Sequence, residues 1–552
     1  GWPSTVPRLR DAFFVSPLVH GSRRLDLQVG KTLFDYADEL RVRVPTSCGR
    51  TGECHECVVE VRRGSGALSN LTEAEAFLRG DYRLACQASI VDSEAEVEFA
   101  VLRRQPRILT RAVRRRVDLD PLTRRDGDAV RCGDARIDSY RGAVYGMAVD
   151  VGTTTVAMNL VDLETGEISH TASFENPQRF GGSDIMHRIS YDGGPHRGEL
   201  RSVMLSAINF EVGEMCRHVG IHRRQVYEAV LVGNATMRDL LFGFDVQTIG
   251  EKPYKSVLEL ECERGERSTT SISTTARKMG LRIMPTASVY GGPLVGSHVG
   301  ADVAADMLAV GMDEAEEEVM LVDVGTNTEV VVGNRHRLMA ASCPAGPAFE
   351  GGEVTYGMPG YDGAVEAVRI DGERVGLTTI GGRDPEGICG SGLVDLLAEL
   401  RRTGRMTELG VFTGGIGEFT FAPQQGMTLS RADVSALAQA KSANYCGQAI
   451  VLRRYGIVPE EVNRLYLAGG FANYINEQSA VDIGFIASVP VGRIAKVGNA
   501  SLEGATIMLT SAPMRDRIEE LVRRVEHVEL ETTEDFFEMF VEGCHFRPMS
   551  IS

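Results

Sequence analysis

Residues 150–155 read DVGTTT, and residues 323–328 read DVGTNT. Each copy lies between apolar runs, in the order strand, glycine turn, strand, tight turn, strand. This order predicts two antiparallel meanders that each open with the same turn. One such hexapeptide is weak evidence, because any Asp-Gly hairpin would contain it. Two copies in matching context indicate an internal duplication, so we expect a pair of similar halves.

The repeated turn carries the residue types that a phosphate site needs. Glycine lets the backbone approach an oxyanion, and threonine hydroxyls and turn N–H groups can bond to its oxygens. An aspartate beside them can hold a magnesium ion, often through water. We therefore expect both turns to grip one nucleotide from two sides. The candidate catalytic residues, which position magnesium and water, are Asp150 and Asp323, and the candidate phosphate-binding residues are Gly152, Thr153, Thr154, Gly325, Thr326 and Asn327.

Three later segments share another pattern, a buried strand followed by a glycine turn and a helix. They cover residues 226–241, 462–475 and 497–509. In the second of them, Gly469 and Gly470 lack side chains, so a flat adenosine ring could lie against the turn. These two glycines are the candidate adenosine-binding residues.

Two glycine-rich stretches add candidates for the same cleft. Gly390 lies at an expected helix start, where free backbone N–H groups suit an anion. The stretch 344–352, "PAGPAFEGG", contains one acid, Glu350. This stretch is either a buried crossover or a loop that lines the cleft with Glu350 near the nucleotide. Asn176 and Gln178 either cap a helix or face the cleft.

A group of cysteines near the start of the chain indicates a metal centre. Cys48, Cys54 and Cys57 share one glycine-containing loop, and Cys86 stands alone after an apolar stretch. Zinc sites usually come as two close pairs of ligands, each on its own knuckle. Three cysteines on one loop and a distant fourth suit a [2Fe–2S] cluster better. We expect such a cluster at these four positions, with zinc as the alternative.

Residues 22–102, which carry this loop, resemble the plant-type and adrenodoxin-type ferredoxin domain. The resemblance implies an α+β, ferredoxin-like (β-grasp) fold. The flanking segments agree, since they read as two strands and a short helix. The family usually has glycine after its second cysteine, where this chain has His55. His55 either faces solvent or tunes the potential of the cluster.

An arginine-rich stretch follows the ferredoxin-like segment. Residues 103–125 contain nine arginines and two prolines. They form either a solvated, loosely ordered connector or a basic surface for an acidic partner or for the acidic remainder of the chain. A flexible connector would let the cluster move between an electron donor and an acceptor.

From about residue 144 to 548 the chain resembles the ASKHA superfamily of actin, sugar kinases and heat-shock chaperones. In that α/β fold, two RNase-H-like halves clasp ATP. Within it, the chain is similar to the reductive activators of corrinoid proteins, which join an N-terminal [2Fe–2S] ferredoxin to an ASKHA ATPase. The motifs that carry this resemblance are "NPQ" at 176–178, "GSDIMHRI" at 182–189, "VGNATM" at 232–237, "DVGTNTEV" at 323–330, "CPAGPAFEGGEV" at 343–354, "GICGSGLVD" at 387–395 and "LAGGFANY" at 467–474.

The resemblance implies both an organisation and an activity. The expected order is a [2Fe–2S] ferredoxin domain at 1–102, an arginine-rich linker at 103–143, the first ASKHA half at 144–315 and the second at 316–552. The expected activity is that of an ATP-hydrolysing electron-transfer activase, which returns one electron to an inactive cobalt(II) corrinoid protein and restores cobalt(I) for methyl transfer. Its cofactors would be the cluster and ATP with Mg²⁺. Its partners would be a corrinoid protein and a low-potential electron donor, and a homodimer is compatible with the sequence.

Other functions remain open at this point. One is an ASKHA small-molecule kinase that the iron–sulfur domain regulates, and another is a non-enzymatic redox sensor. A third is an activator of 2-hydroxyacyl-CoA dehydratases, but that family uses a [4Fe–4S] cluster that bridges two subunits. Such a cluster does not fit the ferredoxin loop.

The composition narrows the choice of partners. The chain has 552 residues, 43% of them hydrophobic, which predicts two to four domains. A net charge of −17 disfavours nucleic acid and anionic membrane. No apolar run approaches the roughly 20 residues of a membrane span, and no signal peptide is evident, so we expect a cytoplasmic protein. Eleven cysteines, an odd number, argue against a disulfide framework.

Overall fold

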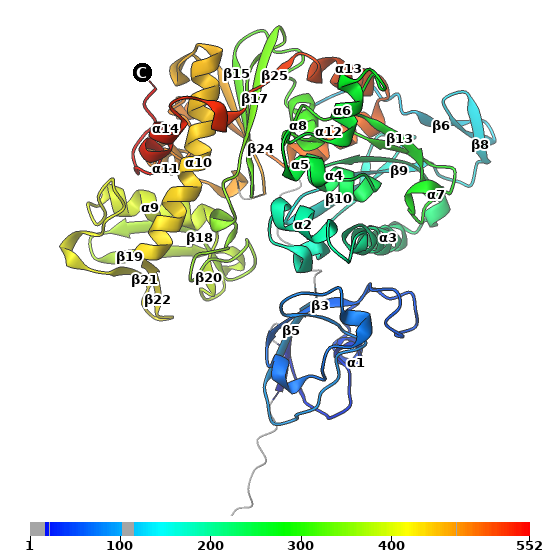
Figure 1. The fold of residues 1–552 in the computed structure, drawn as a ribbon, viewed down its shortest axis with the longest axis horizontal. Coiled ribbons are helices and arrows are strands. Elements are labelled where there is room, and N and C mark those ends of the chain that lie inside the picture. The colour runs from blue at the N-terminus through cyan, green and yellow to red at the C-terminus, as the bar shows by residue number, and fades with distance from the viewer. Residues whose placement is uncertain (1–16, 21–22, 102–114, 471, 552) are drawn as a thin grey trace, which may run out of the picture. The chain divides into compact units, whose positions relative to one another are not determined.

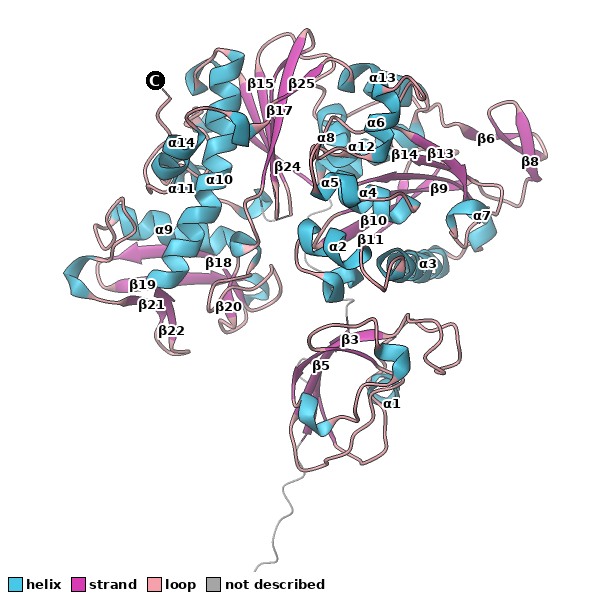
Figure 2. Ribbon diagram, viewed as in Figure 1, coloured by secondary structure: helices cyan, strands magenta, loops and turns pink. Residues whose placement is uncertain are grey.

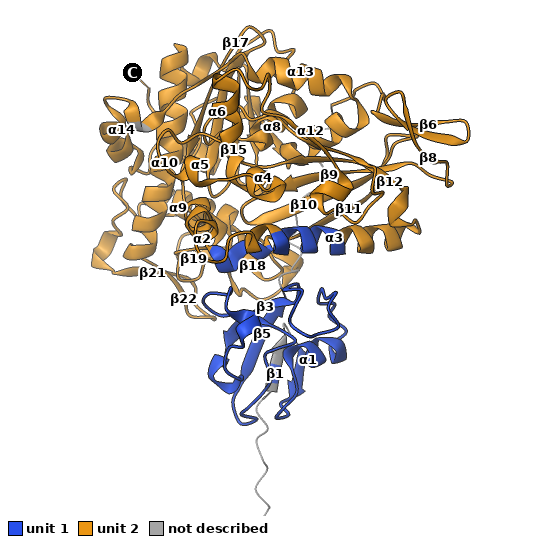
Figure 3. Ribbon diagram, turned by 45° about the vertical axis from the view of Figure 1, so that its right-hand side comes forward, with its two compact units in different colours: residues 1–104, 177–181, 202–210 blue, residues 105–176, 182–201, 211–552 orange. Residues whose placement is uncertain are grey.

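The structure is a computed structural model that describes residues 17–20, 23–101, 115–470 and 472–551 (Figures 1 and 2). The chain divides into two compact units, which Figure 3 distinguishes by colour. The first unit contains residues 1–104, 177–181 and 202–210, and the second contains the remainder.

The first unit is built on a mixed β-sheet. Its elements are β1 (Pro17–His20), β2 (Arg23–Asp26), α1 (Leu33–Glu39), β3 (Val58–Arg63), β4 (Tyr82–Leu84) and β5 (Val97–Val101). The strands lie in the order β2-β1-β5-β3-β4, with β1 and β5 parallel and the other neighbours antiparallel. This arrangement confirms the predicted ferredoxin-like fold.

The helix of the first unit begins with a capping box. Thr32 accepts a hydrogen bond from the backbone N–H of Asp35, and the Asp35 carboxylate accepts one from the backbone N–H of Thr32. Such a cap stabilises a helix by about 1 kcal/mol. The helix buries Leu33, Phe34 and Tyr36, so its apolar face completes the core of the unit.

The second unit opens with the first predicted meander, β9 (Tyr145–Val151), β10 (Thr155–Asp162) and β11 (Ile168–Glu175). Its sheet continues through β12 (Val226–Val232), β14 (Ser288–Gly291) and β13 (Ile272–Thr275), in the order β11-β10-β9-β12-β14-β13. β12 runs parallel to β9 and brings Val232 opposite Asp150. The helices in this part of the chain are α2 (Ile185–Asp192), α3 (Glu199–Val219), α4 (Ala235–Phe242), α5 (Gln247–Gly250), α6 (Val257–Glu263), α7 (Ala276–Met279) and α8 (Ala301–Ala309), of which α3 contains the residues 202–210 assigned to the first unit.

The second half repeats this plan. Its meander is β15 (Val319–Val324), β16 (Thr328–Asn334) and β17 (Arg337–Cys343), followed by β23 (Arg464–Ala468), β24 (Ile494–Gly498) and β25 (Val525–His527). The order is β24-β23-β15-β16-β17-β25, and β23 runs parallel to β15 with Ala468 opposite Asp323. Both sheets thus place a parallel strand beside the first strand of a meander, which confirms the duplicated α/β fold. The helices are α9 (Gly390–Arg402), α10 (Arg431–Tyr455), α11 (Glu477–Asp482), α12 (Ala500–Thr510), α13 (Pro513–Val522) and α14 (Phe536–Gly543).

One helix joins the two halves. α12 follows β24 of the second sheet, yet it packs against α8, β9 and β12 of the first half. Figure 1 shows α12 beside α8. The residues at the start of α12 can therefore contact the first Asp-Val-Gly-Thr turn.

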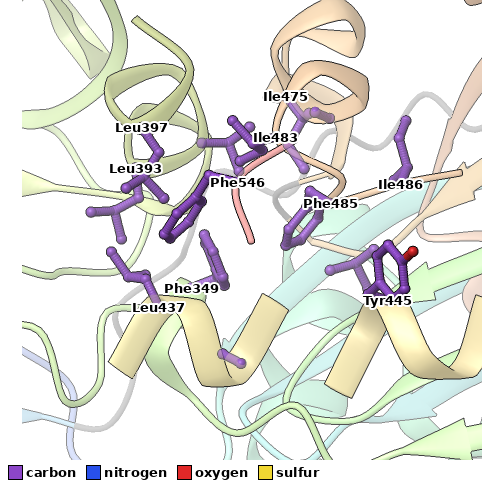
Figure 4. Close-up of a cluster of buried hydrophobic side chains, with 14 of the residues drawn as sticks. Phe349, Leu393, Leu397, Leu437, Tyr445, Ile475, Ile483, Phe485, Ile486 and Phe546 are labelled. Atoms are coloured by element: carbon purple, nitrogen blue, oxygen red, sulfur yellow. The ribbon is translucent and has the colours of Figure 1, made fainter. Parts of the chain in front are cut away.

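An insertion between β17 and α10 adds small sheets and part of a large apolar core. The sheets contain β18 (Ala364–Asp371), β19 (Arg374–Thr379), β20 (Gly387–Ile388), β21 (Glu418–Ala422) and β22 (Met427–Ser430). Figure 4 shows the core around Phe349 and Phe485, whose rings meet edge to face with centroids 4.9 Å apart. Such a pair contributes about 0.5–1.5 kcal/mol beyond burial. Because Phe349 precedes Glu350, this core anchors the loop that carries the candidate acid.

Part of the predicted linker is folded, which corrects the expectation of a loose connector there. Within residues 115–143, β6 (Thr123–Asp126), β7 (Ala129–Cys132) and β8 (Ala135–Ser139) pair antiparallel in that order. Arg115 donates hydrogen bonds of 2.6 and 3.1 Å to the buried carboxylate of Asp313. This arginine thus binds the acidic remainder of the chain, as the second interpretation expected. The preceding stretch, residues 103–114, lies outside the described residues.

Among the helices of the described residues, none combines the length and apolar character that crossing a bilayer requires.

Candidate functional site

The two Asp-Val-Gly-Thr turns meet at one cavity of the second unit. The first turn joins β9 to β10, and the second joins β15 to β16. The cavity has a volume of about 220 Å³. Its walls include all the residues that the sequence assigned to the nucleotide, which are Asp150, Gly152, Thr153, Thr154, Asp323, Gly325, Thr326, Asn327, Glu350, Gly390, Gly469 and Gly470.

A carboxylate links the two turns across the cavity. The hydroxyl oxygens of Thr154 and Thr326 lie 3.2 Å apart. Both hydroxyls donate to the Glu350 carboxylate, over 3.1 and 2.5 Å. Glu350 ends a short 3-10 helix, Ala348–Glu350, and lines the cavity, so the structure agrees with the cleft-lining alternative. Because these hydroxyls are the predicted phosphate donors, Glu350 occupies a place that phosphate oxygens would take.

Buried acids surround the same cavity. Burial raises the pKa of Asp150 to about 7, against the effect of a hydrogen bond from Asn499, and the charge of Asp323 adds to the rise. Burial also raises the pKa of Asp323. The pKa of Asp302 rises to about 8 through burial and the charges of Asp150 and Asp323. Ionised acids this close together need a cation to offset their repulsion and desolvation.

Three further acids at or beside the cavity, Asp302, Asp306 and Glu329, were not predicted from the sequence. Asp302 and Asp306 lie on α8, and Glu329 lies near the start of β16. Asp302 and Glu329 line the cavity, and Asp306 accepts a hydrogen bond of 2.9 Å from the Ser501 hydroxyl. A signal was present, because residues four apart on a helix share one face. In the described residues no three acids, histidines or cysteines are arranged to hold a single ion, and Mg²⁺ usually takes one or two carboxylates, completed by phosphate and water.

The glycines assigned to adenosine and to an anion seat also have defined surroundings. Gly469 has φ +110°, and a Cβ there would lie 2.2 Å from the carbonyl oxygen of Val324, so only glycine fits. A Cβ on Gly470 would meet nothing within 4 Å, so open space lies beside this glycine at the cavity wall. Gly390 is the first residue of α9, with Cys389 at its N-cap. The start of this helix therefore lies at the cavity wall, where backbone N–H groups of Ser391 and Gly392 bond to the Cys389 sulfur.

Asn176 supports the backbone of the first turn. Its Nδ2 donates to the carbonyl oxygen of Gly152 over 2.8 Å, and its backbone N–H donates to the carbonyl of Thr154 over 2.8 Å. The N-cap of α2 is Asp184. Asn176 also directly precedes the 3-10 helix Pro177–Gly181, so its place in the chain remains compatible with the capping alternative.

The candidate cluster site lies in the first unit, on the loop between α1 and β3. Left-handed backbone conformations at Gly49, Arg50, Gly52 and His55 wrap this loop tightly. Arg50 ties the loop to α1, since its guanidinium lies 4.1 Å from the centre of the Phe34 ring. The loop is thus held in place by contacts outside the cysteines themselves.

The cysteines differ in burial and in acidity. Cys57 and Cys86 are buried with their sulfurs 3.4 Å apart. Burial disfavours the Cys48 thiolate, but hydrogen bonds from Thr51 and from the Cys54 backbone outweigh it and lower the pKa of Cys48 to about 5. The hydrogen bond from Cys57 lowers the pKa of Cys86 to about 7. The same hydrogen bond, together with burial, raises the pKa of Cys57. Because iron binds thiolates, a cluster at these residues would take the place of the thiol protons.

His55 takes a position that the sequence left open. It is partly buried, and its ring stacks on that of Phe77 with centroids 4.3 Å apart. His55 is therefore only partly exposed to solvent, because one face of its ring packs against the Phe77 ring.

The fold and the two sites define a class of protein, an ASKHA-type nucleotide-cleft protein with a ferredoxin domain on the same chain. Three family models match. The model described as the C-terminal domain of RACo, the ASKHA domain, matches residues 317–552; the RACo middle region matches residues 145–315; and the 2Fe-2S iron-sulfur cluster binding domain matches residues 19–91. The chain belongs to the family of reductive activators of corrinoid proteins. The last model supports a [2Fe–2S] cluster, and all four candidate cysteines lie inside its match.

Named relatives cover most of the chain. The corrinoid activation enzyme RamQ of Eubacterium limosum is 29% identical over 429 residues, which are 73% of this chain and 70% of that protein. The [Co(II) methylated amine-specific corrinoid protein] reductase of Methanosarcina barkeri is 22% identical over 421 residues, 71% of this chain and 75% of that protein. A solved reductive activator for corrinoid, iron-sulfur protein is 27% identical, with a TM-score of 0.70, over 97% of this chain and 99% of that one.

Proposed function

We propose that this chain is an ATP-dependent reductive activator that transfers one electron from its [2Fe–2S] cluster to the cobalt of an inactive corrinoid protein. The observation that carries the proposal is the presence, in one chain, of a [2Fe–2S] domain and both RACo models. Two relatives are named a corrinoid activation enzyme and a corrinoid protein reductase, which supports the same substrate class.

The proposed reaction moves a single electron. Cys48, Cys54, Cys57 and Cys86 would hold the cluster, which would supply the one electron that converts cobalt(II) to cobalt(I), the nucleophile used for methyl transfer. A low-potential donor would replace that electron. Because this transfer is uphill from ordinary cellular donors, ATP binding or hydrolysis must favour a different state of the complex.

The nucleotide cleft supplies the residues for that coupling. We assign the hydroxyls of Thr154 and Thr326 to the phosphates, which replace the Glu350 carboxylate that these hydroxyls now bind. Asp150 and Asp323 position the metal and the attacking water, and Gly469 provides the surface for adenosine. When bound, Mg²⁺ supplies positive charge that offsets the phosphates and the buried acids.

A nucleotide held in this way would contact both halves of the second unit. The first turn belongs to the sheet of β9, and the second belongs to the sheet of β15. Nucleotide phosphates bound by both turns favour a closed conformation of the two halves. Release of the phosphates favours an open conformation. We propose that this change alters how the corrinoid protein is held while the electron is transferred.

The test combines purified protein, a cobalt(II) corrinoid protein, a low-potential donor, Mg²⁺ and ATP. Cobalt(I) formation is followed by absorption, and ATP hydrolysis is measured in parallel. The wild type should form cobalt(I) only with ATP, Asp323→Asn should lose both activities, and Cys57→Ser should hydrolyse ATP without reducing cobalt. Asp371→Asn, an exposed acid on β18, is the matched control and should behave as the wild type.

Other results would overturn the proposal. Phosphorylation of a small molecule, with no effect on cobalt, would indicate a kinase that the cluster regulates. Binding of a partner that depends on cluster reduction but not on ATP would indicate a redox sensor. Light scattering on the same samples tests whether two copies associate, with which the sequence is compatible.

A further inference from the structure

The tetrapeptide Val-Gly-Asn-Ala occurs twice, at residues 232–235 and 497–500. In both places a strand ends and a helix begins. β12 leads through Gly233 and Asn234 into α4, and β24 ends at Gly498, so that Asn499 precedes α12. The second duplicated motif of this chain therefore lies in the same structural context in both halves, and the proposed function above uses neither asparagine.

Both asparagines are helix N-caps. The side-chain oxygen of Asn234 accepts the backbone N–H of Met237 over 2.9 Å, and that of Asn499 accepts the backbone N–H of Leu502 over 2.7 Å. Capping uses only the amide oxygen, so the amide NH₂ of each residue keeps its donors for another partner.

In both cases that partner belongs to the first Asp-Val-Gly-Thr turn. Nδ2 of Asn234 donates to the hydroxyl oxygen of Thr153 over 2.9 Å. Nδ2 of Asn499 donates to Oδ2 of Asp150 over 2.9 Å. Each asparagine thus connects a helix start to a residue that the proposed function places at the phosphates or at the metal.

These two bonds leave the reactive atoms free. A threonine hydroxyl that accepts from Asn234 still has its own proton, which can be donated to a phosphate oxygen. A carboxylate whose Oδ2 accepts from Asn499 keeps Oδ1 for a metal ion or its water. Because Asn499 follows a strand of the second sheet and Asp150 lies one residue before the end of a strand of the first, the orientation of this carboxylate depends on both halves.

We propose that Asn234 and Asn499 are paired positioning residues, which orient Thr153 and Asp150 for nucleotide binding and hydrolysis. The inference rests on the proposed ATPase function. The competing explanation is that both residues are helix caps and nothing more. Aspartate separates the two roles, because it caps a helix as well as asparagine does but has no N–H to donate.

The experiment measures ATP hydrolysis by the full-length protein carrying Asn499→Asp, Asn234→Asp or Asn476→Asp. Asn499→Asp should lower kcat about 100-fold, as expected for a misplaced catalytic group, with little change in KM. Asn234→Asp should raise KM for ATP about 10-fold, as for the loss of one hydrogen bond to a phosphate donor. Asn476 caps α11 by accepting from Ser479 over 3.0 Å and lies outside the cavity walls, so Asn476→Asp should match the wild type.

Asn499→Ser provides a neutral second variant in case the added carboxylate prevents folding. Serine also caps helices, but its hydroxyl is too short to reach Asp150, so kcat should again fall while the melting temperature stays near that of Asn476→Asp. Wild-type kcat in both Asn499 variants would overturn the inference and leave the proposed function intact. If activity falls only in variants whose melting temperature also falls, the inference would be overturned as well. If the wild type hydrolyses no ATP, the proposed function and the inference fall together.

Discussion

Replacing Asp302 by asparagine should stabilise the metal-free protein at alkaline pH and weaken its ATPase. Asp302 lines the nucleotide cavity, and burial together with the charges of Asp150 and Asp323 raises its pKa to about 8. Asparagine has nearly the same shape and no charge. The substitution therefore removes an unfavourable buried carboxylate, one of the acids whose charge a cation at Asp150 and Asp323 would offset.

The expected magnitude follows from the two pKa values. In the unfolded chain the pKa of an aspartate is about 3.9, so the folded state binds this proton more tightly. The stability that the proton provides is complete below about pH 4 and is lost as the pH rises to about 8. At 1.36 kcal/mol per pH unit, the free energy of unfolding falls by about 5 kcal/mol between pH 4 and pH 8. Relaxation of the neighbouring acids should reduce this change to about 2–3 kcal/mol.

Thermal melting between pH 5 and pH 8.5 measures the effect. In EDTA, the melting temperature of the wild type should fall between pH 5 and pH 8.5. The melting temperature of Asp302→Asn should fall a few degrees less. Added Mg²⁺ should stabilise the wild type at pH 8 more than the variant, because the ion offsets a charge that only the wild type has. Asp371→Asn should follow the wild-type curve in both buffers.

The reasoning about the buried acids is refuted if Asp302→Asn is less stable than the wild type at pH 8 without metal. A pH dependence identical to that of the wild type would refute it as well, because the carboxylate would then have an ordinary pKa.

Three further outcomes are expected. Iron and sulfide assays should give about two of each per chain, and Cys57→Ala should bleach the protein; four irons or stoichiometric zinc would contradict the cluster. Asp150→Ala and Asp323→Ala should each abolish ATP hydrolysis with the cluster spectrum intact; if one of them is tolerated, the two turns do not share a nucleotide. Cleavage at a protease site inserted within residues 103–114 should slow cobalt reduction at micromolar concentration, because tethering raises the local concentration of the cluster; equal rates before and after cleavage would exclude this role.

The protease site is placed within residues 103–114 because the structure shows a fold in the later part of the linker that the sequence did not predict. The arginine content of residues 103–125 allowed either a loose connector or a basic surface, and it could not show that the partner of Arg115 is Asp313, 198 positions away. A window of local sequence contains no information about such a distant partner. The described part of the linker folds with the second unit, so a fragment that lacked it would lose native contacts.

The turns could be predicted, whereas the acid group beside them could not. Each Asp-Val-Gly-Thr turn is specified by adjacent residues and by the strands on either side, so local patterns suffice. Asp302 approaches Asp150 only because α8 packs on the same assembly as β9, which depends on the three-dimensional arrangement of the sheets. Asn499 was seen as part of a glycine turn, but its bond to Asp150 spans 349 positions.

The Glu350 carboxylate has a consequence for ligand selection. It satisfies the hydroxyls of Thr154 and Thr326, so any incoming anion must displace an internal competitor. A tethered group of this kind acts at an effective concentration of about millimolar or higher. Inorganic phosphate has no further contact to compensate for this exchange, whereas a nucleotide bound as proposed would also contact Gly469 and Gly470. We therefore expect the cleft to bind the complete nucleotide in preference to free phosphate.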